Sequence, residues 1–254
     1  MITRALVRGI SDSYTHATVQ APPPRPIDLQ LARSQHHRYI EVLQALGLDV
    51  IHIPQDPDLP DCCFIEDCAL LHEGLALITN PGAPSRGRET NAVRSYLGKV
   101  AHKVEFMVPP ATLDGGDCLR IENRIYVGLS SRSNAEGAAR VRETFAPAGL
   151  DVIEVPVRGA LHLKSVCSYL GNGFLVLAGD TISPSVFGDV EILPVSREEA
   201  YAANCLAING TVICSAGYPV TQSKIKAAGF DVVPLDMSEI KKGDGSLTCL
   251  SILF

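Results

Sequence analysis

The sequence predicts an α/β fold in which about five copies of a strand–strand–helix–strand unit close into a ring. Three observations carry this prediction. Short apolar runs rich in β-branched residues end at a proline again and again along the chain. Pairs of apolar segments joined by turn residues lie between these runs, and helix-like stretches follow them. The last copy lacks one strand, which the N-terminal segment could supply.

The proline-terminated runs are spaced at regular intervals. They are typical of strands that leave a sheet at a turn, because proline cannot donate to a sheet ladder. Roughly 40 to 55 residues separate successive copies, the length of one supersecondary unit in a repeat protein. The runs are 49–54, 104–109, 151–156, 191–194 and 231–234.

A hairpin is expected in each interval between these runs. Asn209-Gly210 between two apolar runs is a strong hairpin signal, since both residues tolerate the positive φ of a tight turn. The other turns are expected at Glu73-Gly74, Glu122-Asn123 and Gly171-Asn172-Gly173.

Helix-like stretches such as 134–145 and 221–228 follow the hairpins and end near a glycine, the residue that commonly stops helices. The last unit begins at 249–254 and ends before its second strand. If strand 5–10 completes it, the ring closes and only short, protected sheet edges remain. We therefore expect one domain, 1–254. A doubly wound sheet is disfavoured, because no Gly-x-Gly-x-x-Gly follows the first strand.

Composition is that of an ordinary globular protein, with 46% hydrophobic and 20% charged residues. The net charge of -6 argues against nucleic-acid binding, which usually needs a basic stripe. No apolar run approaches the ~20 residues that span a bilayer, and no signal peptide is recognisable, so we expect a cytoplasmic protein without membrane partners. Eight cysteines in a chain without a recognisable secretion signal indicate reduced thiols. The chain has no Cys-x-x-Cys pair of the kind that forms structural zinc sites.

Cys249 is the first candidate for chemistry. It follows Asp244-Gly245-Ser246, a turn-forming run that would leave it at the exposed mouth of a terminal strand. A thiol beside a histidine becomes a useful nucleophile when its pKa falls from ~8.5. A buried structural thiol is the alternative, and position alone leaves both interpretations open.

His162 and two acidic pairs occupy the same place in different repeats. His162 lies between apolar residues at the predicted centre of the ring, where the alternative is a satisfied core histidine. Asp114 and Asp117 flank two glycines, at the phase where another repeat has Glu66-Asp67. A tight turn would explain the glycines but not the repeated carboxylates. Buried carboxylates need cationic partners, and a guanidinium ligand would fit.

Arg86 and Arg132 follow strand ends in consecutive repeats. Each could hold a substrate carboxylate through two parallel hydrogen bonds. The alternative for either residue is a solvated loop charge.

Six segments of the chain resemble those of the dimethylarginine dimethylaminohydrolases. The similarity extends over nearly the whole chain, and the motifs are specific in combination. The family belongs to the guanidine-modifying superfamily, whose fold is a five-fold pseudosymmetric α/β propeller of ββαβ-type repeats, in agreement with the repeats found above. The segments are 60–67, 80–86, 113–117, 161–165, 202–205 and 247–249.

The resemblance implies hydrolysis of N-ω-methylated arginines to citrulline and methylamine or dimethylamine, with no cofactor and no metal. Carried over by position, Cys249 is the nucleophile, His162 the general acid/base and Asp114 the carboxylate that orients it. Some members have glutamate in place of Asp114, and the shorter side chain should keep the role but shift His162. The implied substrate-binding residues are Asp67 with Glu66 nearby for the guanidinium, Arg86 and Arg132 for the α-carboxylate, Asp61 for the α-ammonium, and Thr18 in a lid, 11–25.

The implied partner is a small methylated arginine, with no nucleic acid and no membrane, and a homodimer is left open. Two rival functions remain. An arginine or agmatine deiminase would share the scaffold and the Cys-His-carboxylate set, although the short chain and the Thr248-Cys249 pair near its end favour the methylarginine enzyme. A non-catalytic guanidine sensor would need no nucleophile.

Overall fold

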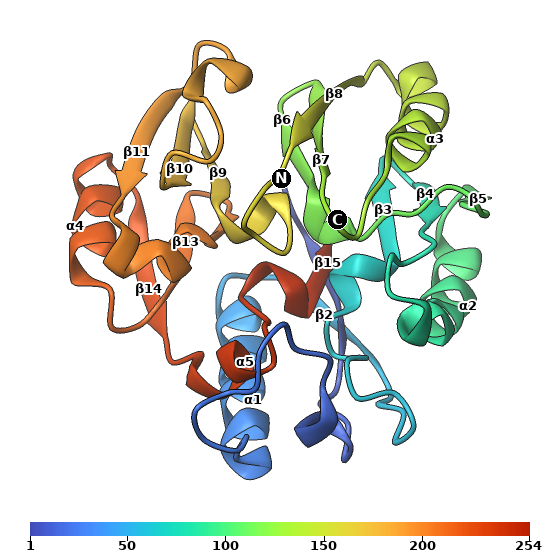
Figure 1. Cartoon of the computed structure of the whole chain (residues 1–254), viewed down its shortest axis with the longest axis horizontal. Coiled ribbons are helices and arrows are strands. Elements are labelled where there is room, and N and C mark those ends of the chain that lie inside the picture. The colour runs from blue at the N-terminus through green and yellow to red at the C-terminus, as the bar shows by residue number, and fades with distance from the viewer.

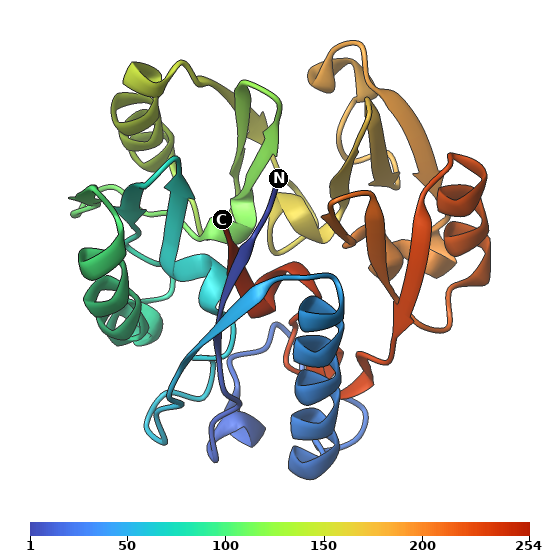
Figure 2. The same ribbon diagram turned by 180° about the vertical axis from the view of Figure 1, so that it is seen from behind.

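Five three-stranded sheets surround a common centre (Figures 1 and 2) in a computed structural model that describes all 254 residues. In each sheet an inner strand pairs antiparallel with the middle strand, and the middle strand pairs parallel with the outer one. This architecture confirms the predicted five-fold α/β propeller. From inner to outer strand, four sheets are β3 (Ala69–His72), β4 (Leu75–Ile78), β5 (Lys103–Phe106); β6 (Cys118–Ile121), β7 (Arg124–Leu129), β8 (Asp151–Pro156); β9 (Cys167–Gly171), β10 (Phe174–Ala178), β11 (Glu191–Val195); and β12 (Leu206–Ile208), β13 (Thr211–Ser215), β14 (Asp231–Leu235).

The fifth sheet joins the two ends of the chain. Its inner strand is β15 (Ser251–Leu253), its middle strand β1 (Arg4–Arg8) and its outer strand β2 (Asp49–Ile53). Leu6 lies opposite Ile252 in the antiparallel pair and opposite Ile51 in the parallel pair. The N-terminal strand therefore supplies the missing strand, as predicted, and the two termini lie close together (Figures 1 and 2).

The first four helices connect middle strands to outer strands on the periphery of the ring, and the short fifth helix follows the outer strand β14 (Figure 1). α1 begins at Asp28, whose side chain accepts hydrogen bonds from the backbone N–H groups of Gln30 and Leu31, the usual N-cap contact. The predicted helices 134–145 and 221–228 are present with slightly different ends. A 3₁₀ helix, Pro184–Phe187, replaces the helix of the third unit. The helices are α1 (Leu29–Ala45), α2 (Thr90–Val100), α3 (Ala135–Phe145), α4 (Pro219–Ala227) and α5 (Ser238–Lys242).

The hairpin turns form where the sequence predicts them. Asn209 and Gly210 have φ values of 49° and 95°, and Glu73 and Gly74 have 48° and 77°. Such backbone twist matches the twist of the flanking strands and fixes their register.

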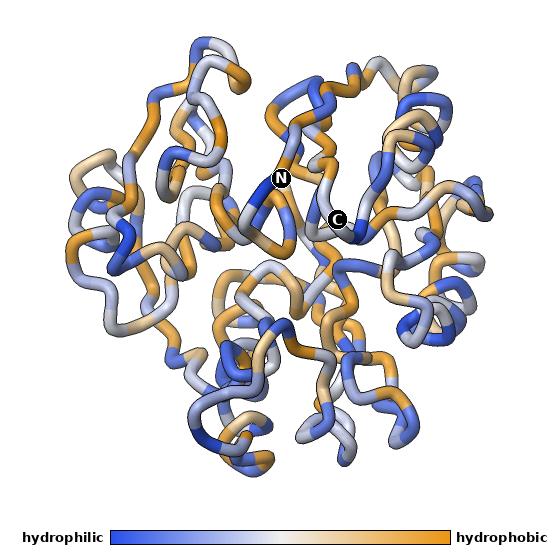
Figure 3. The backbone as a smooth tube through the Cα atoms, viewed as in Figure 1, coloured by the Kyte–Doolittle hydropathy of each residue, from blue (hydrophilic) through white to orange (hydrophobic).

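The core consists of several apolar clusters, each packed between one sheet and its neighbours. In the cluster beneath α3, for example, Val141 and Phe145 pack against Leu113 and Val127. Apolar residues follow the strands, and polar residues gather on loops and helices (Figure 3). None of the helices combines the length and the apolar character needed to cross a bilayer.

A short 3₁₀ helix precedes each inner strand at the centre of the ring. These five helices, which we call the ring of turns, contain or border Cys249, His162 and the acidic pairs Glu66-Asp67 and Asp114/Asp117. Because each repeat enters its inner strand at the same point, the clusters from distant parts of the chain meet there. The members are Ile65–Cys68, Gly115–Asp117, Leu163–Ser165, Arg197–Ala203 and Thr248–Leu250.

Candidate active site

A small cavity at the ring of turns brings together seven of the nine predicted site residues. The other two lie outside it: Asp114 is fully buried behind the cavity, and Glu66 lines a different one. The predicted residues in the cavity are Thr18, Asp61, Asp67, Arg86, Arg132, His162 and Cys249.

His162 and Asp114 form the pair that was predicted. Nε2 of His162 lies 3.1 Å from Oδ2 of Asp114, so the aspartate is long enough to reach the imidazole. Oδ1 of Asp114 accepts a hydrogen bond from the backbone of Gly82 at 2.8 Å. The Asp114 backbone in turn donates to Ser133 Oγ at 3.1 Å. These contacts fix the carboxylate, and the carboxylate orients the ring of His162.

The imidazole of His162 is held in its charged form. Burial lowers its pKa, but the charge of Asp67, the hydrogen bond to Asp114 and the charge of Asp117 outweigh burial and raise the pKa to about 9. His162 is therefore protonated at neutral pH and can act as a proton donor.

Asp67 is a buried carboxylate that stays ionised. Its Oδ2 accepts a hydrogen bond from Arg86 at 2.6 Å, and its Oδ1 accepts one from the backbone of Gly116 at 2.8 Å. Burial raises the pKa of Asp67, but the positive charges of His162 and Arg86 and these hydrogen bonds bring it down to about 2. A permanent negative charge thus lines the cavity.

The two glycines after Asp114 have a packing role that the sequence did not reveal. A Cβ atom on Gly116 would lie 2.6 Å from Nδ1 of His162, and one on Gly115 would lie 2.0 Å from the carbonyl oxygen of Glu66. Neither glycine has a positive φ. They are needed because neighbouring turns of the ring approach closely here, and not because of the backbone conformation of a tight turn.

Cys249 is half-buried, whereas the other seven cysteines are buried. It lies in the 3₁₀ helix Thr248–Leu250 just before β15, and not in the terminal strand itself as expected. Burial, followed by the charges of Glu66 and Asp67, raises the pKa of its thiol. A cation bound in the cavity would favour the thiolate, because an opposite charge nearby stabilises the ionised form.

The two arginines differ in how many of their donors are already used. Arg86 donates to Asp67, to Glu89 at 2.8 Å and 3.0 Å, and to the carbonyl of Phe64 at 3.0 Å. Arg132 has a buried Nη1 without a hydrogen-bond partner, 3.6 Å from Oδ2 of Asp114. The carboxylate clamp stays a prediction for both residues, and Arg132 is the one with a free donor.

The segment 11–25, expected to be a lid, lies against the cavity. Thr18 donates to Asp61 from its backbone at 3.0 Å and from its hydroxyl at 2.9 Å. The backbone of Gln20 donates to Asp244 at 2.6 Å. The volume left inside is ≈ 20 Å³, little more than one water molecule needs. An arginine-sized ligand therefore does not fit the cavity in this conformation.

The predicted set of site residues changes at two positions, since Asp244 also lines the cavity and Glu66 does not. Asp244, interpreted from the sequence only as part of a turn, lines the cavity with φ = 58°. Its acidic side chain close to Cys249 in the chain was the signal that could have identified it. Glu66, expected near the guanidinium, instead pairs with Lys164 and accepts a hydrogen bond from Thr248 at 2.9 Å.

Asp67, Asp114 and His162 place their ligand atoms within 4.8 Å of one another. Two carboxylates and an imidazole are a donor set that divalent cations accept. Here, however, Arg86 binds Asp67 and Arg132 lies beside Asp114. The local cations already neutralise the carboxylates, so the cluster is best described as an ion-pair network.

Comparison with known proteins gives a consistent result. The family model for eukaryotic N,N dimethylarginine dimethylhydrolase matches residues 24–252. An N(G),N(G)-dimethylarginine dimethylaminohydrolase from Pseudomonas aeruginosa is 36% identical over 255 residues, covering 100% of this chain and 98% of that protein. The solved structure of the C249S variant of the Pseudomonas aeruginosa enzyme with citrulline has a TM-score of 0.97 at 35% identity and covers 100% of both chains. An H162G dimethylarginine dimethylaminohydrolase in an adduct with S-methyl-L-thiocitrulline has a TM-score of 0.96 at 35% identity, again over 100% of both chains.

Proposed function

We propose that this chain, which belongs to the dimethylarginine dimethylaminohydrolase family, hydrolyses N-ω-methylated arginine to citrulline and a methylated amine. The observation that carries the proposal is the cavity itself, where a protonated imidazole and an ionised carboxylate lie beside the one cysteine that is not buried. The related enzyme of known structure binds citrulline, which is the product proposed here.

Recognition uses charges at both ends of the substrate. Asp67 carries the negative charge that a guanidinium requires, and Asp244 offers a second carboxylate in the same cavity. Arg132 has a free donor for the α-carboxylate. Asp61 takes the α-ammonium once the backbone and hydroxyl donors of Thr18 release its carboxylate. A guanidinium is a poor electrophile, so rigid placement beside the thiolate supplies much of the rate.

The reaction proceeds in two halves. Binding of the cationic guanidinium favours loss of the Cys249 proton to solvent, and the thiolate attacks Cζ. His162 donates its proton to the substituted nitrogen, the C–N bond breaks, and the amine leaves. His162 then accepts a proton from water, and the hydroxide adds to Cζ. Collapse of this second adduct breaks the C–S bond, restores the thiolate and releases citrulline, while the hydroxyl proton is lost to solvent, from which the released amine takes up a proton.

The test is an amine-release assay with asymmetric dimethylarginine, monomethylarginine, arginine and agmatine as substrates. We expect dimethylamine and methylamine from the methylated substrates and little ammonia from arginine or agmatine. Release of ammonia from arginine or agmatine at a higher rate would assign the chain to the deiminases. Tight binding of methylarginine without any amine release would make it a sensor.

The same proposal includes the organisation of the protein. We take the 254 residues as one cooperative unit, because β1 and β15 tie the two ends of the chain into one sheet. Assembly as a homodimer stays a prediction, and sedimentation equilibrium at several protein concentrations would test it.

A further inference from the structure

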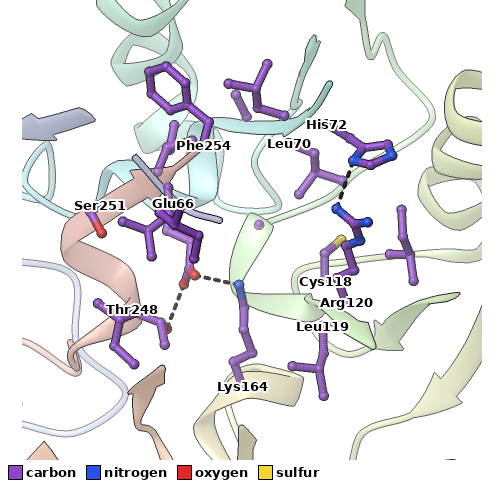
Figure 4. Close-up of a pocket in the computed structure, with 18 of the residues that line it drawn as sticks. Glu66, Leu70, His72, Cys118, Leu119, Arg120, Lys164, Thr248, Ser251 and Phe254 are labelled. Atoms are coloured by element: carbon purple, nitrogen blue, oxygen red, sulfur yellow. Dashed lines mark hydrogen bonds and ion pairs between the residues drawn. The ribbon is translucent and has the colours of Figure 1, made fainter. Parts of the chain in front are cut away.

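The ring of turns has two sides, and adjacent residues of the same turns point to different cavities. Asp67, His162 and Cys249 line the proposed active site. Their near neighbours Glu66, Lys164 and Thr248 line a second cavity of ≈ 820 Å³, which shares no residue with the first (Figure 4). The inner strands of all five sheets contribute to this back cavity. Any change of charge there lies directly behind the proposed reacting groups.

Three repeats meet in a small polar network at this point. Lys164 pairs with Oε1 of Glu66, and the hydroxyl of Thr248 donates to Oε2 of the same carboxylate at 2.9 Å (Figure 4). A fourth repeat adds Asn204, whose amide donates to Thr248 Oγ1 at 3.0 Å and to the carbonyl of Lys164 at 2.8 Å. The residue that precedes Cys249 is thus held by hydrogen bonds to Glu66 and Asn204.

We propose that Lys164 is a positioning residue of the reaction, which cancels the negative charge of Glu66 behind Cys249 and keeps the thiol available for ionisation. The proposal rests on the proposed function, in which Cys249 is the nucleophile. Lys164 lines the back cavity and not the cavity of Cys249, so it contacts no substrate there and acts on the thiol through its charge and its pairing with Glu66.

The electrostatic argument follows from the burial of the pair. The side chains of Glu66 and Lys164 are 13% and 14% exposed, so solvent screens them weakly. Removing one partner of such a pair leaves an uncompensated charge. The charge of Glu66 raises the pKa of the Cys249 thiol, and the charge of Lys164 lowers it. Loss of Lys164 and loss of Glu66 should therefore have opposite effects on the thiol.

Other ionisable groups around Cys249 are common to every variant proposed below. On the active-site side they are Asp61, Asp67, Arg86, Arg132, His162 and Asp244. The phenols of Tyr14, Tyr39 and Tyr201 also act on the thiol, and on the other side of the ring the thiol of Cys118 lies beside the Glu66–Lys164 pair. Because all of them are retained, a difference between variants reports on the Glu66–Lys164 pair.

The experiment measures alkylation of Cys249 by iodoacetamide between pH 6 and pH 10, with the modified peptide identified by mass. Four proteins are compared: the parent, Lys164→Met, Glu66→Gln and the double variant. Gln at position 66 keeps an oxygen that can accept the Thr248 hydroxyl. Lys103→Met removes an exposed lysine that pairs with Glu105 at 2.9 Å and serves as the control.

We expect Lys164→Met to slow alkylation at pH 7 by roughly tenfold, the effect of one pKa unit on the thiolate fraction. Glu66→Gln should accelerate it by a similar factor, and the double variant should return to within about threefold of the parent. The acid limb of the pH profile of kcat/KM for methylarginine should move to higher pH in Lys164→Met and to lower pH in Glu66→Gln. Lys103→Met should change neither quantity.

Unchanged alkylation profiles in both single variants would overturn the proposal. So would a double variant slower than Lys164→Met, because a purely structural role predicts accumulating damage. If Lys164→Met does not fold, Glu66→Gln decides alone, and a rate at or below that of the parent counts against the proposal. The outcome is separate from that of the proposed function, since alkylation needs no turnover and the parent's amine release is measured independently.

Discussion

The ring of turns and the lid contact the same cavity but are held in different ways. In the ring, buried groups from different repeats bind one another: Asp67 accepts from Gly116, and Asp117 accepts from the backbone of Leu163 at 2.8 Å. The lid is anchored near its start by the buried Tyr14, whose hydroxyl donates to the carbonyls of Glu239 and Ile240, but at the cavity edge it is held by Thr18 and Gln20. This difference indicates that the closed ring fixes the positions of the reacting groups. Access of a ligand to the cavity depends instead on hydrogen bonds at the lid that the ligand can replace.

Deleting residues 1–8 should have the largest effect, because β1 is the middle strand of a sheet and links β15 to β2. We expect loss of the cooperative unfolding transition of the whole protein, since the pairing partners on both sides lose their strand. Circular dichroism during thermal unfolding measures this. A truncated protein with the melting temperature of the parent would show that ring closure does not stabilise the centre.

The fold was more predictable than the orientation of side chains within it. Pro54 and the other strand-ending prolines, and turns such as Asn209-Gly210, are local signals, and their repetition revealed the ring. α5 was missed because five residues are too few to display a helical period.

The side of the ring to which a polar residue points could not be predicted. Glu66 and Asp67 are adjacent and both acidic, yet they line different cavities. The use of Arg86 donors by Glu89 could have been anticipated, because the two residues are three apart in one 3₁₀ helix. The sequence does not indicate which turns of the ring approach each other closely, as they do at Gly115 and Gly116.

His162 should make the stability of the ring depend on pH. Its pKa is raised from 6.5 to about 9 in the folded protein, so its contribution is fully present below pH 6.5 and is lost as the pH rises through 9. This corresponds to about 3 kcal/mol of unfolding free energy. Urea unfolding at pH 6.5 and pH 9.5 should show this loss in the parent and a smaller one in His162→Asn. Equal losses in both proteins would mean that His162 is not charged in the folded state.

Substituting Arg86 should mainly lower the stability of the protein, whereas substituting Arg132 should mainly weaken substrate binding. Arg86→Met should cost about 3–5 kcal/mol of stability, because it leaves the buried Asp67 and Glu89 unpaired. Arg132→Met should cost less stability than Arg86→Met, because Asp114 keeps His162 as a partner. It should raise KM for methylarginine roughly tenfold or more, the effect of a lost charge-assisted hydrogen bond. Arg142→Met, which removes an exposed pair with Glu154, is the control. A KM unaffected by Arg132→Met would exclude that residue from the clamp.

The smallest effect is expected at the lid. Thr18→Val removes the hydroxyl donor to Asp61 but keeps the backbone donor, so the closed segment should loosen only slightly. We expect a change in KM of about threefold or less, from a net hydrogen-bond contribution of ~0.5–1.5 kcal/mol. Thr15→Val, elsewhere in the lid, provides the comparison. A loss of folding cooperativity in Thr18→Val would show that the lid supports the ring and does not merely cover it.

The central claim is that the closed ring presents Cys249 as the nucleophile beside His162. Rapid quenching of the reaction with dimethylarginine, followed by peptide mass spectrometry, tests it most directly. The account predicts a transient adduct on the Cys249 peptide, with the mass of the substrate less dimethylamine, and neither adduct nor turnover in folded Cys249→Ser. Dimethylamine release by Cys249→Ser at a rate near that of the parent, or an adduct on another residue, would contradict it.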